Sequence, residues 1–341
     1  MGFIYALLAA FLFALSVPLG KALLGGLRPF ELSALCYLGS GAGLLAWRLF
    51  TGGGRDEAPL ERRDLPYVWG FVLAGGVLAP LLLFTGLNLT TSSSASMLLN
   101  FELVFTSLIA IVIFREHGGG RFWTAAALLT AGACALSWEG GGVNLSPGAA
   151  LVLAASLFWA VDNNLTARVS IKDPVTLAAI KGLAGGVING VLALCLHGGF
   201  PPLKFALAAL ALGVFSYGVS LVFFILAMRD LGASRAGAFF GSYPFIGAAL
   251  GVITLGEPVT ARLLAGGALM LAAFFTLAFE RHGHRHRHMP LEHDHAHAHG
   301  DGHHAHAHEG AAGRHSHPHR HDPVEHTHPH LPDAHHRHEH I

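Results

Sequence analysis

Apolar residues fill ten long runs of the chain, and polar residues gather in the short breaks between them. The runs are about 20 residues long, which is the length that an α-helix needs to cross a hydrocarbon core about 30 Å thick. Backbone amides find no water in that core, so each run is predicted to be a helix. The pattern predicts an all-α polytopic membrane protein whose ten spans cover residues 3–24, 30–50, 66–88, 93–114, 121–138, 147–167, 174–196, 203–228, 234–255 and 261–280.

Composition agrees with a membrane protein and excludes several other classes. Only 12% of the residues are charged, about half of the roughly 25% in soluble domains, and the mean hydropathy is +0.51. The sequence has no nucleotide-binding GxxxxGK[ST] loop, no HExxH and no Ser/His/Asp set, so we expect neither an ATP-driven pump nor an enzyme. A basic surface interleaved with aromatic residues is also missing, so no nucleic-acid partner is expected. The three cysteines lie in or at the end of apolar runs and are interpreted as packing residues.

The basic residues predict the orientation in the membrane. With the N-terminus in the cytoplasm, most lysines and arginines of the breaks lie on the inner side, as the positive-inside rule requires. We therefore expect a multi-pass protein of a bacterial cytoplasmic membrane with both termini in the cytoplasm. The inner set comprises Arg48, Arg55, Arg62, Arg63, Arg115, Arg121, Arg168, Lys172, Arg229 and Arg235, and the outer set Lys21, Arg28, Lys204 and Arg262.

A weak internal repeat divides the ten spans into two halves. "FREHGGGRFWTAAALL" (114–129) aligns with "LGEPVTARLLAGGALM" (255–270), each with a Glu at a helix exit and an Arg five residues later. Five spans per half is an odd number, so the second half enters from the opposite side. This is the inverted-repeat arrangement of secondary transporters, whose substrate site lies near the midplane. The expected units are residues 1–138, 147–280 and a tail at 281–341. Glycines four apart indicate close helix packing, and the chain is expected to be a monomer or a homodimer.

These features resemble the EamA type of the drug/metabolite transporter superfamily. The resemblance rests on the two five-helix halves, the two aligned exits and "NFELVFTSLIAIVIF" (100–114), and it covers residues 1–280. It implies a ten-helix exporter of amino acids, metabolites or drugs, without naming the substrate. The second span departs from the family pattern, because "LCYLGSG" stands where an Arg is common. Its counterpart in the second half, "IKGLAGG", carries Lys181.

Polar residues inside the spans are the candidates for a substrate or proton site, because a charge at a helix centre costs about 2.5–3.5 kcal/mol. Glu102, in the middle of the fourth span, is interpreted as a proton or cation carrier; the alternative is a neutral carboxyl group that joins two helices. Asp162 and Lys181 are expected at similar depth, as an ion pair or a shared substrate site, and the alternative is a structural pair with Lys181 reaching the interface. Asn163 and Asn164 follow Asp162 and belong to the same candidate site. Asn100 is a weaker candidate, and Asn189 and Tyr243 are expected to add hydrogen bonds.

Glutamates at helix ends and the charged block at residues 55–64 have simpler interpretations. Glu31, Glu116, Glu139 and Glu257 are expected to be interfacial or capping groups. "RDEAPLERRD" is interpreted as a solvated connector. Pro18 and Pro244 are expected to kink the first and ninth spans.

The C-terminal segment is unlike the rest of the chain. Nearly all of the 25 histidines lie between His282 and His340, and almost no apolar residue separates them. Such a segment is predicted to be disordered, and neutral imidazoles at this density bind zinc, nickel or cobalt ions. The densest metal-binding candidates are His293, His295, His297, His299, His303, His304, His306 and His308. The alternative is a low-complexity expansion without function.

The sequence as a whole predicts a secondary transporter that exports small organic metabolites, coupled to protons through Glu102, with no required cofactor. Two alternatives remain open. The first is a divalent-metal exporter to which the tail delivers the ion. The second is a metal buffer or sensor anchored by helices that no longer transport.

Overall fold

The structure is a computed structural model of the whole chain. It describes residues 1–51, 60–139 except 115–119, 141–169, 172–231 and 233–278, together with the tail residues 283–288, 291–297, 315–321, 325–329 and 338–340. The prediction for Glu116 lies outside the described residues, as does most of the block at 55–64.

Helices form ten passages in the described residues, and they match the predicted spans within a few residues. Spans 1 to 5 are α1 (Gly2–Ala14) with α2 (Ser16–Leu23); α3 (Pro29–Thr51); α4 (Leu65–Phe71), η2 (Val72–Leu78) and α5 (Ala79–Leu89); α6 (Ser92–Leu98) with α7 (Phe101–Phe114); and α8 (Gly120–Leu136). Spans 6 to 10 are α9 (Pro147–Ala167); α10 (Pro174–His197); α11 (Leu203–Leu212), η3 (Gly213–Val219) and α12 (Ser220–Leu231); α13 (Ala233–Phe240) with α14 (Tyr243–Leu255); and α15 (Ala261–Ala278).

Six of these passages are long and apolar enough by themselves to cross a membrane, and two shorter apolar helices, Tyr243–Leu255 and Ala261–Thr276, belong to spans 9 and 10. The remaining two passages are α3 and α8, which pack against α10 and α15 and bring the number of passages to ten. A short 3-10 turn, η1 (Arg62–Asp64), precedes α4, and a small hairpin of β1 (Trp138–Glu139) and β2 (Gly142–Val143) joins the two halves.

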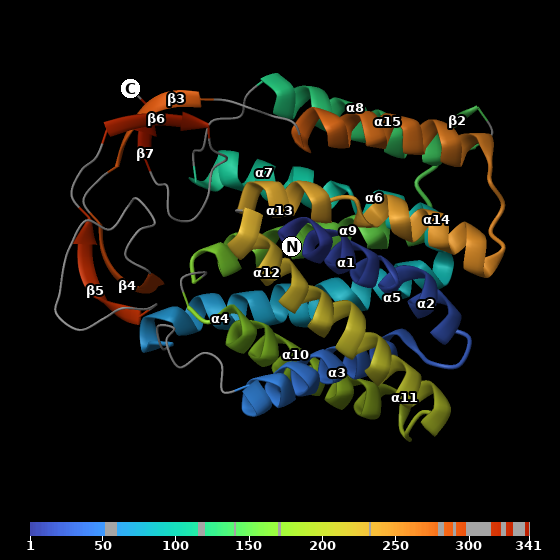
Figure 1. Cartoon of the computed structure of the whole chain (residues 1–341). Coiled ribbons are helices and arrows are strands. Elements are labelled where there is room, and N and C mark those ends of the chain that lie inside the picture. The colour runs from blue at the N-terminus through green and yellow to red at the C-terminus, as the bar shows by residue number, and fades with distance from the viewer. Residues whose placement is uncertain are drawn as a thin grey trace.

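The pairing of the helices follows a pseudo-twofold axis. α3 packs against α10, α6 against α14, and α8 against α15, so spans 2, 4 and 5 each meet their counterpart in the second half (Figure 1). α1 packs against α12, which pairs span 1 with span 8. α9 packs against α5, which pairs span 6 with span 3, so the second pair is the counterpart of the first in the other repeat. The prediction of two inverted five-helix repeats is confirmed by this arrangement.

Departures from regular α-helix also follow the repeat. Span 3 contains the π-helical turn η2, and span 8 contains the π-helical turn η3. Span 4 is interrupted at Leu99–Asn100, and span 9 at Gly241–Ser242. Pro244 lies in the first turn of α14, where a proline needs no backbone partner, so it begins a helix instead of kinking one. Such irregular backbone at membrane depth is tolerated where protein surrounds it.

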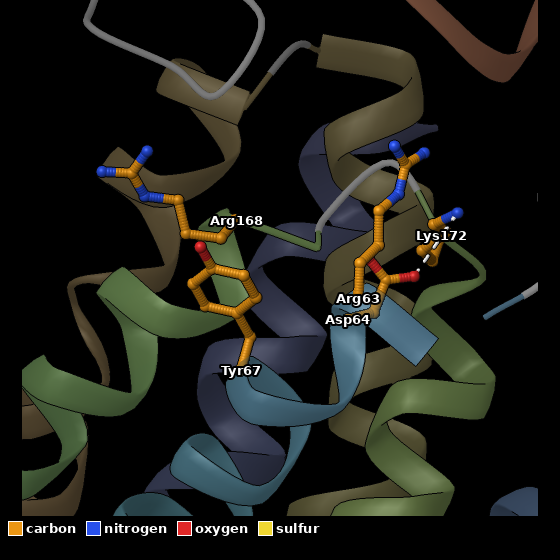
Figure 2. A pocket seen from close by; sticks show the side chains of 5 residues that line it. All are labelled: Arg63, Asp64, Tyr67, Arg168 and Lys172. Atoms are coloured by element: carbon orange, nitrogen blue, oxygen red, sulfur yellow. Dashed lines mark ion pairs between the residues drawn. The ribbon is translucent and has the colours of Figure 1, made fainter. Parts of the chain in front are cut away.

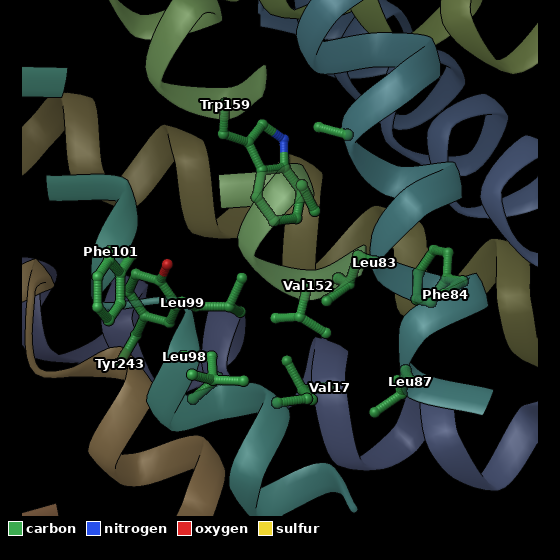
Figure 3. Packing of buried hydrophobic residues seen from close by; sticks show 14 of the residues in the cluster. Val17, Leu83, Phe84, Leu87, Leu98, Leu99, Phe101, Val152, Trp159 and Tyr243 are labelled. Carbon is green, nitrogen blue, oxygen red and sulfur yellow. The ribbon is translucent and has the colours of Figure 1, made fainter. Parts of the chain in front are cut away.

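Small side chains let the helices approach closely at the centre. A Cβ on Gly182 of α10 would lie 2.6 Å from the backbone nitrogen of Gly41 on α3, so only glycine fits this crossing. The spaced glycines therefore serve packing within the chain. Around them lies one large apolar core, in which Val17, Leu87, Leu98 and Val152 come from four different spans (Figure 3).

The described residues of the tail form short strands: β3 (Gly283–His288), β4 (Leu291–His297), β5 (His315–His321), β6 (Glu325–Pro329) and β7 (His338–His340). The strands pair with one another, in the order β6-β3-β7 and β4-β5. The physical reason lies in the alternation of His with other residues, because its period of two matches the side-chain period of a strand.

Candidate functional site

Glu102 lies where the fourth span is interrupted, in the first turn of α7. Two donors from the second half of the chain hold its carboxylate: Asn163 Nδ2 lies 2.8 Å from Oε1, and the Tyr243 hydroxyl lies 3.1 Å from Oε2. The glutamate is partly buried and Asn163 is exposed, so the carboxylate can be reached from outside the helix core. The start of a helix favours a negative charge, because unpaired backbone amides gather there.

Asn164 holds the same two helices together from the buried side. Its Nδ2 donates to the backbone oxygen of Thr106 at 3.1 Å and to that of Ala160 at 2.8 Å. Asn163 also reaches Thr106 Oγ1 at 3.3 Å. The two consecutive asparagines thus have different tasks. Asn163 contacts the candidate proton carrier, and Asn164 fixes α9 against α7.

Asp162 and Lys181 form the ion pair that their predicted depth favours. Lys181 Nζ lies 2.7 Å from Asp162 Oδ2, and Thr166 donates to Oδ1 at 3.1 Å. The pair lies against η2, because a Cβ on Gly75 would come within 2.1 Å of Asp162 Oδ2. The ammonium group also lies 5.4 Å from the centre of the Phe71 ring. The lysine is therefore held by neighbours within the bundle, and its charge is compensated by Asp162.

Two weaker candidates have structural partners. Asn189 Nδ2 donates to Ser33 Oγ at 2.8 Å and to the backbone oxygen of Gly76 at 3.2 Å, which joins α10 to α3 and η2. Asn100 donates to the backbone oxygen of Met97 at 2.8 Å and closes the interruption of span 4. Neither amide contacts Glu102 or the ion pair through a hydrogen bond that the structure describes.

A series of aromatic rings leads from the bundle centre to Glu102, and no sequence motif indicated it. We call Phe13, Tyr37, Tyr217, Phe240 and Tyr243 the aromatic cluster. Tyr37 lies 5.4 Å from Tyr217, between ring centres, and Tyr217 lies 5.5 Å from Phe13. Phe13 meets Tyr243 edge to face at 4.8 Å. Tyr243, which donates to Glu102, lies beside Leu99 and Phe101 of span 4 (Figure 3).

Ion pairs lie at one end of the bundle, which we call the basic end because Arg48, Arg63, Arg168 and Lys172 lie there. Buried Lys172 binds Glu61 at 3.1 Å and Asp64 at 3.5 Å, and Arg48 binds Asp173. The Lys172 pairs connect the segment before span 3 with the segment before span 7, and the Arg48 pair connects the last turn of α3 with that second segment. The interpretation of the charged block as a solvated connector therefore does not hold for Asp64, which is buried, whereas residues 61–63 are exposed. Residue spacing could not show that a distant lysine would bury itself between Glu61 and Asp64.

The same end carries a cavity of about 320 Å³ between the two halves. Tyr67 and Arg168 lie on one side of it, and Arg63, Asp64 and Lys172 on the other (Figure 2). Glu61, beside the cavity, is exposed. The hydrogen bond from Lys172 lowers the pKa of the Glu61 carboxyl below its ordinary value, so the carboxyl group is ionised and paired with Lys172 at neutral pH.

A different kind of contact joins the two halves at the opposite end, which we call the far end. Glu257 accepts hydrogen bonds from the backbone amides of Ser92 at 2.6 Å and of Ser93 at 2.8 Å. It therefore caps α6 from the other half of the chain, and the prediction of a capping role is confirmed. Glu31 caps locally, since it accepts a hydrogen bond from the Arg28 amide at 2.8 Å.

The metal-binding prediction falls on the tail and stays a prediction. His293, His295 and His297 lie on β4, opposite His319, His317 and His315 of β5. The other five candidates, His299, His303, His304, His306 and His308, lie outside the described residues. In the described residues there is no group of three or more His, Cys, Asp or Glu side chains that could hold a metal ion.

Fold and site together define a helical membrane protein of two inverted repeats, with a carboxylate held between the repeats. Comparison with known proteins gives the family. The model of the EamA-like transporter family matches residues 1–138 and again 146–279, so the chain belongs to the EamA-like transporter family.

One relative and one solved structure agree with this assignment. An uncharacterized transporter of Methanothermobacter thermautotrophicus (strain ATCC 29096 / DSM 1053 / JCM 10044 / NBRC 100330 / Delta H) is 31% identical over 293 residues, which cover 81% of this chain and 85% of the relative. A crystal structure of another protein has a TM-score of 0.60 at 20% identity, and the match covers 81% of this chain and 95% of that chain. At that identity the likeness concerns the fold alone.

Proposed function

We propose that this membrane transporter exports a small organic substrate from a bacterial cytoplasm in exchange for protons, which Glu102 carries. The observation that supports this most directly is the position of the carboxylate. It lies at the interruption of span 4, and its two hydrogen-bond donors come from spans 6 and 9 of the other half. A proton that binds Glu102 changes contacts between the repeats, which is what coupling requires.

The different packing of the two parts of span 4 supports the proposal that the substrate reaches Glu102 from the basic end. The outer part, α6, packs against α14 and is capped by Glu257, whereas α7 packs against α9. Asn163, which contacts Glu102, is exposed beside α7. We infer that the far end is closed in this conformation and that substrate reaches Glu102 from the basic end. By the distribution of basic residues, that end faces the cytoplasm.

Asp162 and Lys181 take a positioning role in this proposal. Their charges neutralise each other beside η2, so the pair fixes spans 3, 6 and 7 without adding net charge to the site. The carboxylate of Glu102 then controls the charge of the pathway by gaining or losing one proton.

Proton flux in liposomes tests the proposal. The full-length protein is reconstituted with a pH indicator inside vesicles that are acidified inside, and amino acids, amines and drugs are added outside one at a time. Exchange raises the internal pH when a substrate is found. Glu102→Gln should abolish that rise, while Glu31→Gln, at a helix start away from the pathway, should keep it. If Glu102→Gln moves protons as the unmodified protein does, the proposed route is wrong.

A further inference from the structure

The aromatic cluster joins both repeats beside the carboxylate. Phe13 and Tyr37 belong to spans 1 and 2, and Tyr217 and Tyr243 belong to spans 8 and 9. Phe240 completes the group, with its ring 5.5 Å from Phe13 and 5.4 Å from Tyr243. Because the ring of Tyr243 contacts the cluster and its hydroxyl contacts Glu102, the packed π faces and the negative charge lie next to each other inside the bundle.

Tyrosine is concentrated at this place. Three of the five tyrosines of the chain belong to the cluster, against two of its 23 phenylalanines. Packing between lipid-embedded helices needs no hydroxyl groups, and burying one without a partner costs free energy. The Tyr217 hydroxyl is buried and has no hydrogen bond of normal geometry in the described part of the chain. Its neighbour Ser216, in the same π-helical turn, is also buried without a partner for its hydroxyl. The hydroxyl groups at this place are therefore not explained by the packing of the helices.

The charges decide what kind of ligand fits. Lys181 is already paired with Asp162 at 2.7 Å. Glu102 has the neutral donors Asn163 and Tyr243, and the ion pairs of the described residues include none for it. Among the described residues beside the aromatic cluster, Glu102 therefore offers a negative charge, and the one cation near it, Lys181, is held by Asp162.

We propose that the substrate is a cationic amine with an aromatic or other flat apolar body. This inference rests on the proposed function and names its substrate class. The ammonium group binds Glu102, displacing the Asn163 or Tyr243 donor, and the body lies against the rings of Phe13, Tyr217 and Tyr243. Cations are attracted to aromatic faces as well as to carboxylates, so both parts of the site favour the same charge.

This assignment separates amines from amino acids. A zwitterionic amino acid brings a carboxylate that has to be desolvated, and Lys181 is the nearest group that could receive it. Receiving it means breaking the bond to Asp162, which would leave a buried carboxylate without its partner. An amine avoids that cost. The amine should therefore bind more tightly than the amino acid that carries the same ring.

Calorimetric binding to the purified full-length protein in detergent tests the inference with three probes of similar shape. Phenethylamine is cationic at neutral pH, 2-phenylethanol is neutral, and phenylalanine is zwitterionic. We expect phenethylamine to bind at least about tenfold more tightly than the other two, since a charge–carboxylate contact and a cation–π contact together are worth at least that factor. Glu102→Gln should remove the preference for the amine.

Variants of the aromatic cluster separate binding from folding. Tyr217→Phe removes only the buried hydroxyl, and Phe13→Leu removes one π face and keeps an apolar side chain. Phe13→Leu should weaken phenethylamine binding several-fold because a π face is lost, and Tyr217→Phe should weaken it less because the ring stays. Tyr5→Phe, which lies against Phe223 outside the cluster, should leave binding unchanged. Melting temperatures close to that of the unmodified protein show that the variants are folded.

The outcomes keep this inference apart from the proposed function. If the three probes bind equally or not at all to the folded protein, the amine assignment is wrong. It is also wrong if phenylalanine binds best. In any of these cases, proton exchange that another substrate drives and Glu102→Gln abolishes would leave the transport proposal standing. If phenethylamine binds with the expected preference and moves no protons, the amine site stands and the proton coupling does not.

Discussion

Glu257 lies 2.6 Å from the backbone amide of Ser92, although 165 residues separate them. The glutamate follows span 9 and the serine begins span 4, so the contact joins the two repeats at the far end. A charged acceptor on two backbone amides is stronger than a neutral one. The family transports, and a transporter has to open and close such ends in turn. In the proposed closed state of the far end, this contact is therefore a part of the closure that can be measured.

Removing this cap should weaken the closed conformation. Glu257→Ala leaves two amides at the start of α6 without an acceptor, which should cost about 2 kcal/mol. Chemical unfolding in detergent measures the loss. Glu31→Ala is the matched control, because Glu31 caps its own helix at Arg28 and should cost about 1 kcal/mol or less. Equal effects of the two substitutions would contradict a closure role for Glu257.

The Asp162–Lys181 pair should show strong coupling in a double-mutant cycle. Asp162→Asn leaves the lysine charge uncompensated inside the bundle, and a buried pair broken on one side costs about 3 to 5 kcal/mol. Asp162→Asn with Lys181→Met removes both charges and should recover most of that loss. Unfolding free energies of the four proteins give the coupling. Additive losses would mean that the two charges do not stabilise each other.

Gly75 should tolerate no side chain. A Cβ at this position would lie 2.1 Å from Asp162 Oδ2, so Gly75→Ala has to move the carboxylate away from Lys181. We expect a loss of about 1 to 3 kcal/mol together with impaired transport. Gly120→Ala is the control, because nothing lies within 4 Å of a Cβ there. Comparison of melting temperatures and proton flux distinguishes the two. A Gly75→Ala protein as stable as the control would contradict the described contact.

The ion pair at the basic end predicts a dependence on pH. The pKa of Glu61 is lowered from its ordinary value of 4.5 by the hydrogen bond from Lys172. Its stabilising contribution is therefore complete above that value and is lost as the pH falls through the lowered pKa. Glu61→Gln should melt at a slightly lower temperature at neutral pH, and the difference should vanish in acid. A difference that stays constant down to strongly acidic pH would exclude this titration.

The tail is expected to bind metal without being needed for transport. The full-length protein should take up zinc, nickel or cobalt ions in calorimetry, and a protein ending at Arg281 should not. Proton-coupled flux of an organic substrate should be equal in both. If instead the full-length protein lowers cellular metal and Glu102→Gln does not, the chain exports metal. Metal tolerance that depends on the tail and not on Glu102 would indicate a buffer.

The sequence by itself determined the number, order and opposite orientation of the spans, because length and apolarity decide which segments enter a bilayer. It also indicated Glu102, Asp162 and Lys181, since polar groups at membrane depth are costly and stand out against apolar neighbours. It placed Asp162 near Lys181 because spans 6 and 7 are consecutive and their connection is short.

Only the tertiary structure decided which helix faces meet. Most spans are apolar on every side, so periodicity does not indicate which side contacts protein and which contacts lipid. The aromatic cluster, the cap from Glu257 to Ser92 and the burial of Lys172 between Glu61 and Asp64 all join residues that are distant in sequence. Such contacts depend on the lateral arrangement of ten similar helices, which close packing of small and large side chains selects.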